Sequence, residues 1–369
     1  MNTSEQYVFS QHMRNIDVRF ESFAEECMEL QSPEALSIIF ATDIHYIQKY
    51  AKFVPSYYKL KEMVDFTGFV GADLLAITGD IVDGNTTIQG QYRDIFDCMA
   101  LLKQSKTSSV LLSKGNHDTC EWYAHREKLK AGNWLTAKDW YIHAINPLRV
   151  QYPMILDDEN VEGGYYYIDF PLQKIRVINL NTSDTETVLD EDGYLEREYS
   201  SQWRLGMREK QLKWLVKALT FEEAGWSVVF MSHSFLCETE EQPEKVSNGK
   251  LAWEIILSYK NNLKGIQKSD ELHYEAEVSY DFTDNKSNDV LVYVFGHLHK
   301  DSDFVYNGIT AVSFKNILNS DLDNELGWDD GTKHISGGWN FISIDKKTRE
   351  FKSKRFEVPE ADRVLKLVK

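Results

Sequence analysis

Six short apolar runs are the feature that most restricts the fold of this chain. Runs of about four to eight apolar residues predict strands that are covered on both faces. Helical patterns around residues 57–69 and 91–103 separate the first three runs, and this alternation of strand and helix favours an α/β fold. The six predicted strands are residues 36–41, 73–77, 109–112, 175–179, 227–231 and 290–295.

Polar side chains directly follow five of these predicted strands. In an open α/β sheet, ligands bind beyond the carboxyl ends of the strands, so these side chains are expected to meet in one crevice despite their separation in sequence. Aspartate, asparagine and histidine are all groups that bind metal ions. The candidates are Asp43, His45, Asp80, Asp83, Asn116, His117, His233, His297 and His299.

The spacing within two clusters indicates how the ligands are presented. Residues two apart on an extended segment point to the same side, so Asp43 with His45, and His297 with His299, can each bind an ion from one side. Glycines also lie beside the clusters, and glycine tolerates backbone turns that other residues resist. We therefore expect the chain to turn sharply beside the ligands, at positions 79, 115 and 296.

The number and type of the ligands predict two metal ions. Seven ligands of mixed carboxylate, imidazole and amide type exceed what one tetrahedral zinc ion takes. They suit two divalent ions that share a bridging carboxylate, and manganese, iron, zinc, cobalt and nickel all accept such ligands. Two ions about 4 Å apart can hold the attacking and the leaving oxygen of a displacement at phosphorus. This chemistry points to a hydrolase that acts on phosphate esters.

The five clusters, taken in order, resemble the motifs of the calcineurin-like metallophosphoesterases, which read D-x-H, G-D-x-x-D, G-N-H-[DE], H and G-H-x-H. All five are present, and they span residues 43–299. Each motif alone is weak, whereas five in order at strand ends are specific. The resemblance implies that family's fold, an α/β four-layer α/β/β/α sandwich in which helices flank two mixed sheets.

The resemblance also implies a role for each residue. His117 is similar to the residue that protonates the leaving oxygen or stabilises the transferring phosphoryl group, and Asp83 is similar to its orienting partner. Hydrolysis would proceed by in-line attack of a hydroxide that bridges the two ions. A leaving alkoxide does need a proton, and an imidazole is a suited acid. The first ion would be held by Asp43, His45, Asp80 and His299, and the second by Asp80, Asn116, His233 and His297.

Two differences from related motifs argue against two branches of the family. Purple acid phosphatases carry a tyrosine ligand three residues after the bridging aspartate, where this chain has Asp83, so a ferric-tyrosinate site does not fit. Serine/threonine protein phosphatases continue with Arg-Gly after that position, whereas Gly84 and Asn85 follow here. A phosphodiesterase is therefore favoured. A nuclease of the same superfamily, a phosphomonoesterase, and a scaffold that keeps the fold without turnover stay open as alternatives.

The charge balance limits the substrate. The chain of 369 residues carries 41 Lys and Arg against 58 Asp and Glu, a formal net charge of −17, and such a field repels a long anionic polymer. A phosphate ester of small or moderate size is therefore expected, and duplex nucleic acid is disfavoured. The oligomeric state stays open.

Neither a secretory signal nor a membrane span is expected. The first residues lack a basic region followed by an apolar stretch, and no apolar run approaches the roughly 18 residues of a spanning helix. The four cysteines lie far apart without a CxxC pair, which fits a reducing compartment. The expected location is cytoplasmic.

An amphipathic helix is expected within residues 1–33, ahead of the main domain. Apolar residues at gaps of three to five predict it over residues 7–30, either packed on the core or docking beside it. A docking role would make the chain part of a larger assembly. The main domain then covers residues 34–369, because no linker rich in Pro, Gly or Ser divides it.

Insertions in the main domain are expected to carry the substrate specificity. The third of them is strongly charged and shows no clear strand. Its acidic residues 238–244 are interpreted as a solvated loop, placed where their charge could screen substrates. Asp118, before the first insertion, is interpreted as a helix cap in preference to a residue that supports the ligands from behind. The insertions are predicted at 119–164, 184–206 and 236–288, and further strands at 304–306, 310–314, 339–344 and 351–356.

Overall fold

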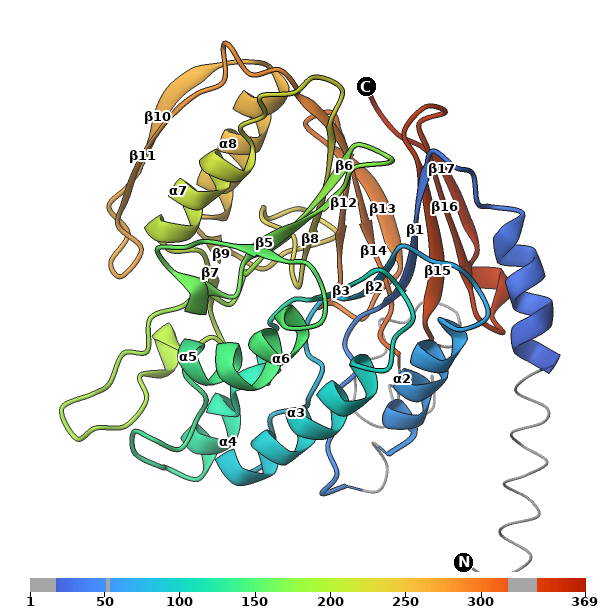
Figure 1. The fold of residues 1–369 in the computed structure, drawn as a ribbon. Helices are drawn as coiled ribbons and strands as arrows, with labels where there is room; N and C mark the ends of the chain where they lie inside the picture. Colours follow the sequence, from blue (N-terminus) through green and yellow to red (C-terminus); the bar gives the residue numbers. More distant parts are fainter. Residues whose placement is uncertain (1–17, 51–53, 318–336) are drawn as a thin grey trace, which may run out of the picture.

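The computed structural model describes residues 18–50, 54–317 and 337–369. Two large mixed sheets pack face to face, and helices cover their outer faces (Figure 1). This arrangement confirms the predicted four-layer α/β/β/α sandwich. All six apolar runs that predicted strands are strands in the structure, and nearly all of their residues are buried.

The first sheet has six strands in the order β17-β16-β15-β1-β2-β3. β1, β2 and β3 are parallel, and the C-terminal strands add to the other side of β1 as an antiparallel meander. The strands are β1 (Ala35–Ala41), β2 (Leu74–Ile77), β3 (Ser109–Leu112), β15 (Asn340–Asp345), β16 (Glu350–Arg355) and β17 (Arg363–Lys366).

The second sheet has seven strands in the order β13-β14-β12-β8-β6-β5-β4. Its four central strands, β14, β12, β8 and β6, are parallel, and antiparallel strands close both edges. The strands are β4 (Ile155–Leu156), β5 (Tyr166–Phe170), β6 (Ile175–Leu180), β8 (Ser227–Ser232), β12 (Asp289–Phe295), β13 (Ser302–Tyr306) and β14 (Ile309–Ser313).

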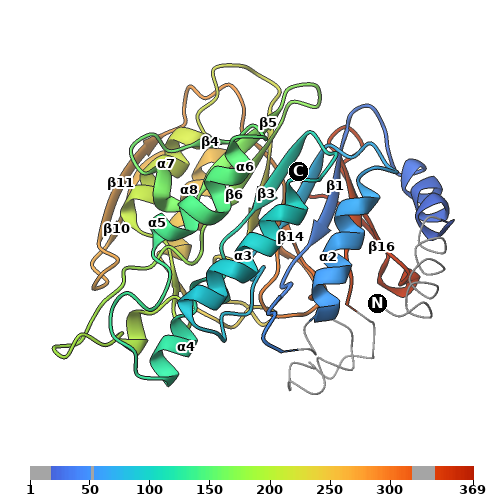
Figure 2. The same ribbon diagram turned by 60° about the horizontal axis from the view of Figure 1, so that its bottom comes forward.

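Two helices cover the first sheet, α2 (Val54–Phe66) and α3 (Ile88–Leu102), which lie side by side in Figure 2. Both were predicted, but each begins three residues earlier than its pattern. At α3 the reason is local, because the Thr87 side chain accepts a hydrogen bond from the main chain of Gly90 and caps the helix. Shorter helices follow β3, namely α4 (Glu121–Arg126), α5 (Ala137–Trp140) and α6 (Asn146–Arg149).

The outer face of the second sheet is covered by α7 (Glu209–Ala218) and α8 (Gly249–Lys260). Beyond them lies a two-stranded hairpin of β10 (Lys264–Ser269) and β11 (Ala276–Asp281), visible at the edge of Figure 1. The expectation that residues 236–288 hold no clear strand was therefore wrong. Every second side chain of β11 is buried and the others are exposed, so charges on the outer face hid the pattern.

Residues 18–28 are helical and pack against the core, while residues 7–17 of the predicted helix lie outside the described residues. Phe20 and Phe23 are buried, and their rings contact Phe66, Trp339 and Phe356 at centroid distances of 5.3 to 6.3 Å. This apolar face is occupied within the chain, which argues against its use for docking a partner. No helix in the described ranges is both long and apolar enough to cross a membrane.

Candidate metal centre

The predicted ligands lie on turns that follow five strands, and the structure brings these turns together between the two sheets. All nine side chains are buried or partly buried. Such convergence at carboxyl strand ends was the expectation for an α/β sheet. β1 leads to Asp43 and His45, β2 to Asp80 and Asp83, β3 to Asn116 and His117, β8 to His233, and β12 to His297 and His299.

Asp43, His45 and His299 form one group of possible ligands. The Nε2 atoms of His45 and His299 are 3.0 Å apart, and Oδ1 of Asp43 lies 3.4 Å from Nε2 of His299. Two ligands bound about 2.1 Å from one ion at a right angle are separated by about 3 Å, so this spacing fits a shared ion. Oδ1 of Asp43 is buried and has no hydrogen-bond partner in the described part of the chain, as expected for a metal ligand.

Asp80, His233 and His297 form a second group, which Asn116 joins. Nε2 of His233 lies 3.2 Å from Oδ2 of Asp80, 3.0 Å from Nδ1 of His297 and 2.9 Å from Oδ1 of Asn116. Oδ2 of Asp80 also lies 3.8 Å from Nε2 of His45 in the first group. Asp80 therefore stands between the two groups, in the position that a bridging carboxylate requires.

The electrostatics of the site favour bound positive charge. Burial alone would lower the pKa of His233, but the neighbouring Asp80 and Asp43 carboxylates outweigh it and raise that pKa to about 10. Burial likewise opposes a charge on Asp43, yet the nearby His299 and His233 rings hold the pKa of Asp43 below its usual range. A buried site that stabilises a proton on His233 also suits a divalent cation, which replaces this proton when it binds.

Several of the candidate ligands have strained backbones. Left-handed φ values are uncommon for residues other than glycine and concentrate at functional sites. The pairs Asp43 with His45 and His297 with His299 therefore reach the crevice from left-handed residues, and the extended geometry assumed from their spacing was wrong. The φ angles are 52° at Asp43, 49° at His45, 49° at Asp80, 74° at His297 and 54° at His299.

The three glycines beside the ligands serve two different purposes. Gly79 has a φ of 92°, so there the predicted sharp turn is confirmed. Gly115 and Gly296 have no such φ, so the left-handed freedom of glycine is not what their positions require. They provide space instead, because a Cβ would lie 2.1 Å from Oδ1 of Asp80 at Gly115 and 1.8 Å from Oγ1 of Thr42 at Gly296.

The histidine rings are held from behind by contacts that the sequence did not reveal. Nδ1 of His233 lies 2.8 Å from the main-chain carbonyl of Thr78, and Nδ1 of His299 lies 2.9 Å from the amide of Asn316. Nε2 of His297 is 2.5 Å from Oε2 of Glu244. Such outer contacts fix the ring orientation of metal-binding histidines.

Asn316 and Glu244 were both missed, for different reasons. Asn316 follows β14 closely, so the rule that located the ligands could have found it. Glu244 belongs to the acidic residues interpreted as a solvated loop; it is exposed in a loop, and its contact with His297 is what that interpretation did not include. Nothing local in the sequence separates Glu244 from the other glutamates of its segment.

Asp118 is a buried support for two of the turns. Its carboxylate accepts hydrogen bonds from the main-chain N–H groups of Gly115 at 2.7 Å, Asp80 at 3.1 Å and Val82 at 3.2 Å. The predicted helix-cap role was therefore wrong. The carboxylate ties the turn after β3 to the turn after β2, which holds Asp80 in place.

His117 lies beside both groups, and Asp83 contacts it through the main chain. Nδ1 of His117 is 2.7 Å from the carbonyl oxygen of Asp83, while Oδ2 of Asp83 lies 3.8 Å from Nδ1 of His45. Burial lowers the pKa of His117, but the charges of Asp80 and Asp83 outweigh it and raise that pKa. The other ring nitrogen, Nε2, faces Gln202 at 3.3 Å.

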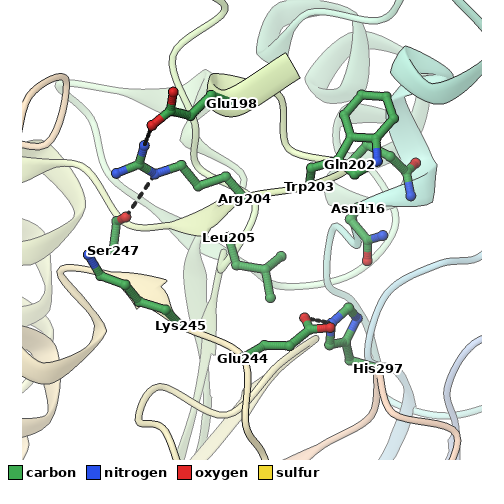
Figure 3. A pocket seen from close by; sticks show the side chains of 10 residues that line it. All are labelled: Asn116, Glu198, Gln202, Trp203, Arg204, Leu205, Glu244, Lys245, Ser247 and His297. Carbon is green, nitrogen blue, oxygen red and sulfur yellow. Dashed lines mark hydrogen bonds and ion pairs between the residues drawn. The ribbon is translucent and has the colours of Figure 1, made fainter. Parts of the chain in front are cut away.

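A cavity of about 620 Å³ opens beside this centre. It is lined by Asn116 and His297 and by residues of two of the predicted insertions, as Figure 3 shows. Room for part of a substrate therefore lies next to the candidate ligands. The other lining residues are Glu198, Gln202, Trp203, Arg204, Leu205, Glu244, Lys245 and Ser247.

Comparison with known proteins shows the family of the chain. The chain is similar to a dimetal phosphatase from Danio rerio (TM-score 0.56, 15% identity, 90% of this chain and 98% of the other covered). It is also similar to a purple acid phosphatase from yellow lupin (Lupinus luteus) seeds (TM-score 0.47, 13% identity, 90% and 53% covered). No curated protein sequence matches the chain. The family model described as calcineurin-like phosphoesterase matches residues 36–301, and the chain therefore belongs to that family.

Proposed function

We propose that this protein is a metal-dependent phosphodiesterase with two divalent ions at the described centre. The observation that carries the proposal is the convergence of seven ligand side chains around Asp80, beside His117. Bound there, two ions would activate water and neutralise charge on the phosphoryl group. Asp43, His45, Asp80 and His299 would hold one ion, and Asp80, Asn116, His233 and His297 the other; manganese, iron, zinc, cobalt and nickel all suit these ligands.

His117 is the proposed general acid. The P–O bond to the leaving oxygen breaks while a new P–O bond forms to the oxygen of water. The leaving oxygen takes a proton from Nε2 of His117, and the proton lost by water passes to solvent. The Asp83 carbonyl accepts a hydrogen bond from Nδ1 of His117, which leaves Nε2 directed toward Gln202, a residue of the cavity wall.

A nuclease is the less favoured alternative, because the cavity offers no cationic surface for a nucleic-acid backbone. Lys245 and Arg204 are the cationic side chains that line it, and both pair with Glu271. The net charge of −17 repels a long polyanion as well. These features support an ester of small or moderate size as the substrate.

Turnover of two model esters tests the proposed function. Protein stripped of metal and reloaded with manganese is expected to cleave bis(p-nitrophenyl) phosphate faster than p-nitrophenyl phosphate. Release of p-nitrophenolate measures both rates. Faster cleavage of the monoester would identify a phosphomonoesterase instead. Turnover of neither ester, with two ions bound per chain, would support the scaffold alternative.

The contact between Glu244 and His297 is expected to strengthen metal binding. Glu244→Gln should lower the affinity for manganese by about 10- to 100-fold, because the amide holds the His297 ring less firmly and lacks the negative charge of the carboxylate. Calorimetric titration of the stripped protein measures the affinity. Glu240→Gln, at an exposed glutamate of the same segment, is the control and should bind like the wild type. Equal affinity of all three proteins would contradict the role of Glu244.

A further inference from the structure

The cavity beside the metal centre is built mainly by two of the predicted insertions. Residues 198–205 form one side, and residues 244–247 form the other (Figure 3). Short parallel strands, β7 (Leu205–Gly206) and β9 (Val246–Ser247), pair with each other and join the two sides. The two walls of the cavity therefore form one structural unit.

Gln202 stands in front of the nitrogen proposed to give up the proton. Its Nε2 lies 3.3 Å from Nε2 of His117, and its Oε1 is buried and has no hydrogen-bond partner among the described residues. The NH2 group of Gln202 and a protonated Nε2 of His117 are both donors, so a leaving oxygen that accepts from His117 also lies within reach of this amide. The unused acceptor suits a hydroxyl group next to the ester oxygen, because a buried acceptor left unpaired is costly.

A buried carboxylate fixes the main chain that carries Gln202. The hydroxyls of Ser200 and Ser201 donate to Oε2 of Glu121 at 2.8 and 2.6 Å, and all three residues are buried. Oγ1 of Thr119 lies 3.3 Å from Oγ of Ser201. Gln202 is therefore presented from a fixed position, as a residue that selects a substrate requires.

The two cationic side chains of the cavity both pair with carboxylates, and Arg204 also lies 3.9 Å from Oε1 of Glu198. Arg204 and Lys245 both contact Oε1 of Glu271, with a distance of 3.0 Å for the lysine. Oγ of Ser247 donates to the same oxygen at 2.8 Å and accepts from Nε of Arg204 at 3.1 Å. A second phosphate or carboxylate on the leaving group would have to break this network, so an anionic leaving group is disfavoured.

The remaining wall is polar and rich in hydrogen-bonding groups. Glu198 and Glu244 add carboxylates, which accept hydrogen bonds from hydroxyl groups. Apolar surface comes from Leu205 and from Trp203, whose flat ring can lie against the C–H face of a polyol. A long alkyl group would bury polar side chains without partners, which costs free energy.

We propose that this cavity binds an uncharged, polyhydroxylated leaving group, a polyol or sugar unit, and that Gln202 hydrogen-bonds it beside His117. This inference rests on the proposed function. It assigns selectivity for the leaving group to the inserted segments and the hydrolysis itself to the strand-end residues. The reaction would add water across one P–O bond and release the polyol with its hydroxyl restored.

Three methyl phosphate diesters that differ in the second alcohol test the preference. The alcohols are glycerol, 1-propanol and glyceric acid, which compare hydroxyl groups with none and with a negative charge. Two additional hydrogen bonds correspond to about a tenfold higher kcat/KM for the glyceryl over the propyl ester. The released alcohol is measured by mass spectrometry. A propyl or glycerate ester cleaved as fast as the glyceryl ester would overturn the inference.

Failure of the inference can be separated from failure of the proposed function. Bis(p-nitrophenyl) phosphate, cleaved under the same conditions, reports the hydrolysis without any polyol. If it is cleaved while the glyceryl ester gains no advantage, only the leaving-group assignment is wrong. If no diester is cleaved by protein with two ions bound, both the proposed function and the leaving-group assignment are wrong.

A substitution at Gln202 tests its part in the selection. Gln202→Leu, which keeps the size of the side chain, is expected to reduce the glyceryl-to-propyl ratio of kcat/KM from about ten toward one, with the metal content unchanged. Gln104→Leu, at an exposed glutamine outside the cavity, is the control and should keep the ratio. An unchanged ratio in Gln202→Leu would remove Gln202 from the proposal.

Discussion

Asp80→Ala is expected to bind neither metal ion and to lose turnover by roughly a thousandfold or more. Oδ2 of Asp80 lies between His233 and His45, one from each ligand group, so both proposed ion sites share this carboxylate. Without it, each site loses a ligand and a negative charge at the same time. Elemental analysis of the purified protein gives the ions per chain, and cleavage of bis(p-nitrophenyl) phosphate gives the turnover.

Two further variants make the result specific. Asp80→Asn keeps the shape of the side chain and one oxygen that can accept from the N–H of His117, but it lacks the charge. It should therefore also lose ions, although less completely than the alanine variant. Asp284→Ala, at an exposed aspartate, should retain both ions and full activity. Two ions per chain and undiminished turnover in Asp80→Ala would end the dinuclear proposal.

The central strands and the convergence of the candidate ligands could be predicted because their signals are local. A buried strand such as β1 is apolar throughout, and the polar residue that follows it must serve some purpose at the sheet end. The ligand groups therefore follow from strand positions and the rule that strand ends converge. The hairpin strands β10 and β11 were not predicted, because exposed side chains alternate with partly buried ones in β10 and with buried ones in β11.

The supporting residues could not be predicted, because their partners come from distant segments. Asp118 accepts hydrogen bonds from N–H groups up to 38 positions away, and Glu244 contacts His297, 53 positions away. In both cases an acidic residue beside a turn has a simpler local interpretation, as a cap or a solvated side chain. Only the packing of the turns shows that these carboxylates position the candidate ligands.

His117→Ala is expected to retain both metal ions and to lose turnover by roughly 10²- to 10⁴-fold on an ester with an alkyl leaving group. The ions should stay because the contact of His117 with Asp80 is made by its main-chain N–H, at 2.8 Å, which alanine preserves. What alanine lacks is the ring nitrogen, Nε2, that faces the cavity. The same metal and turnover measurements apply.

Two esters whose leaving groups differ in acidity distinguish loss of the general acid from a general loss of activity. p-Nitrophenolate departs without a proton, so His117→Ala should slow cleavage of bis(p-nitrophenyl) phosphate much less than cleavage of an alkyl ester. His143→Ala, at an exposed histidine outside the ligand groups, should slow neither ester. Equal losses on both esters would show that His117 stabilises the phosphoryl group rather than protonating the leaving oxygen. Loss of the ions from His117→Ala would instead make it a ligand.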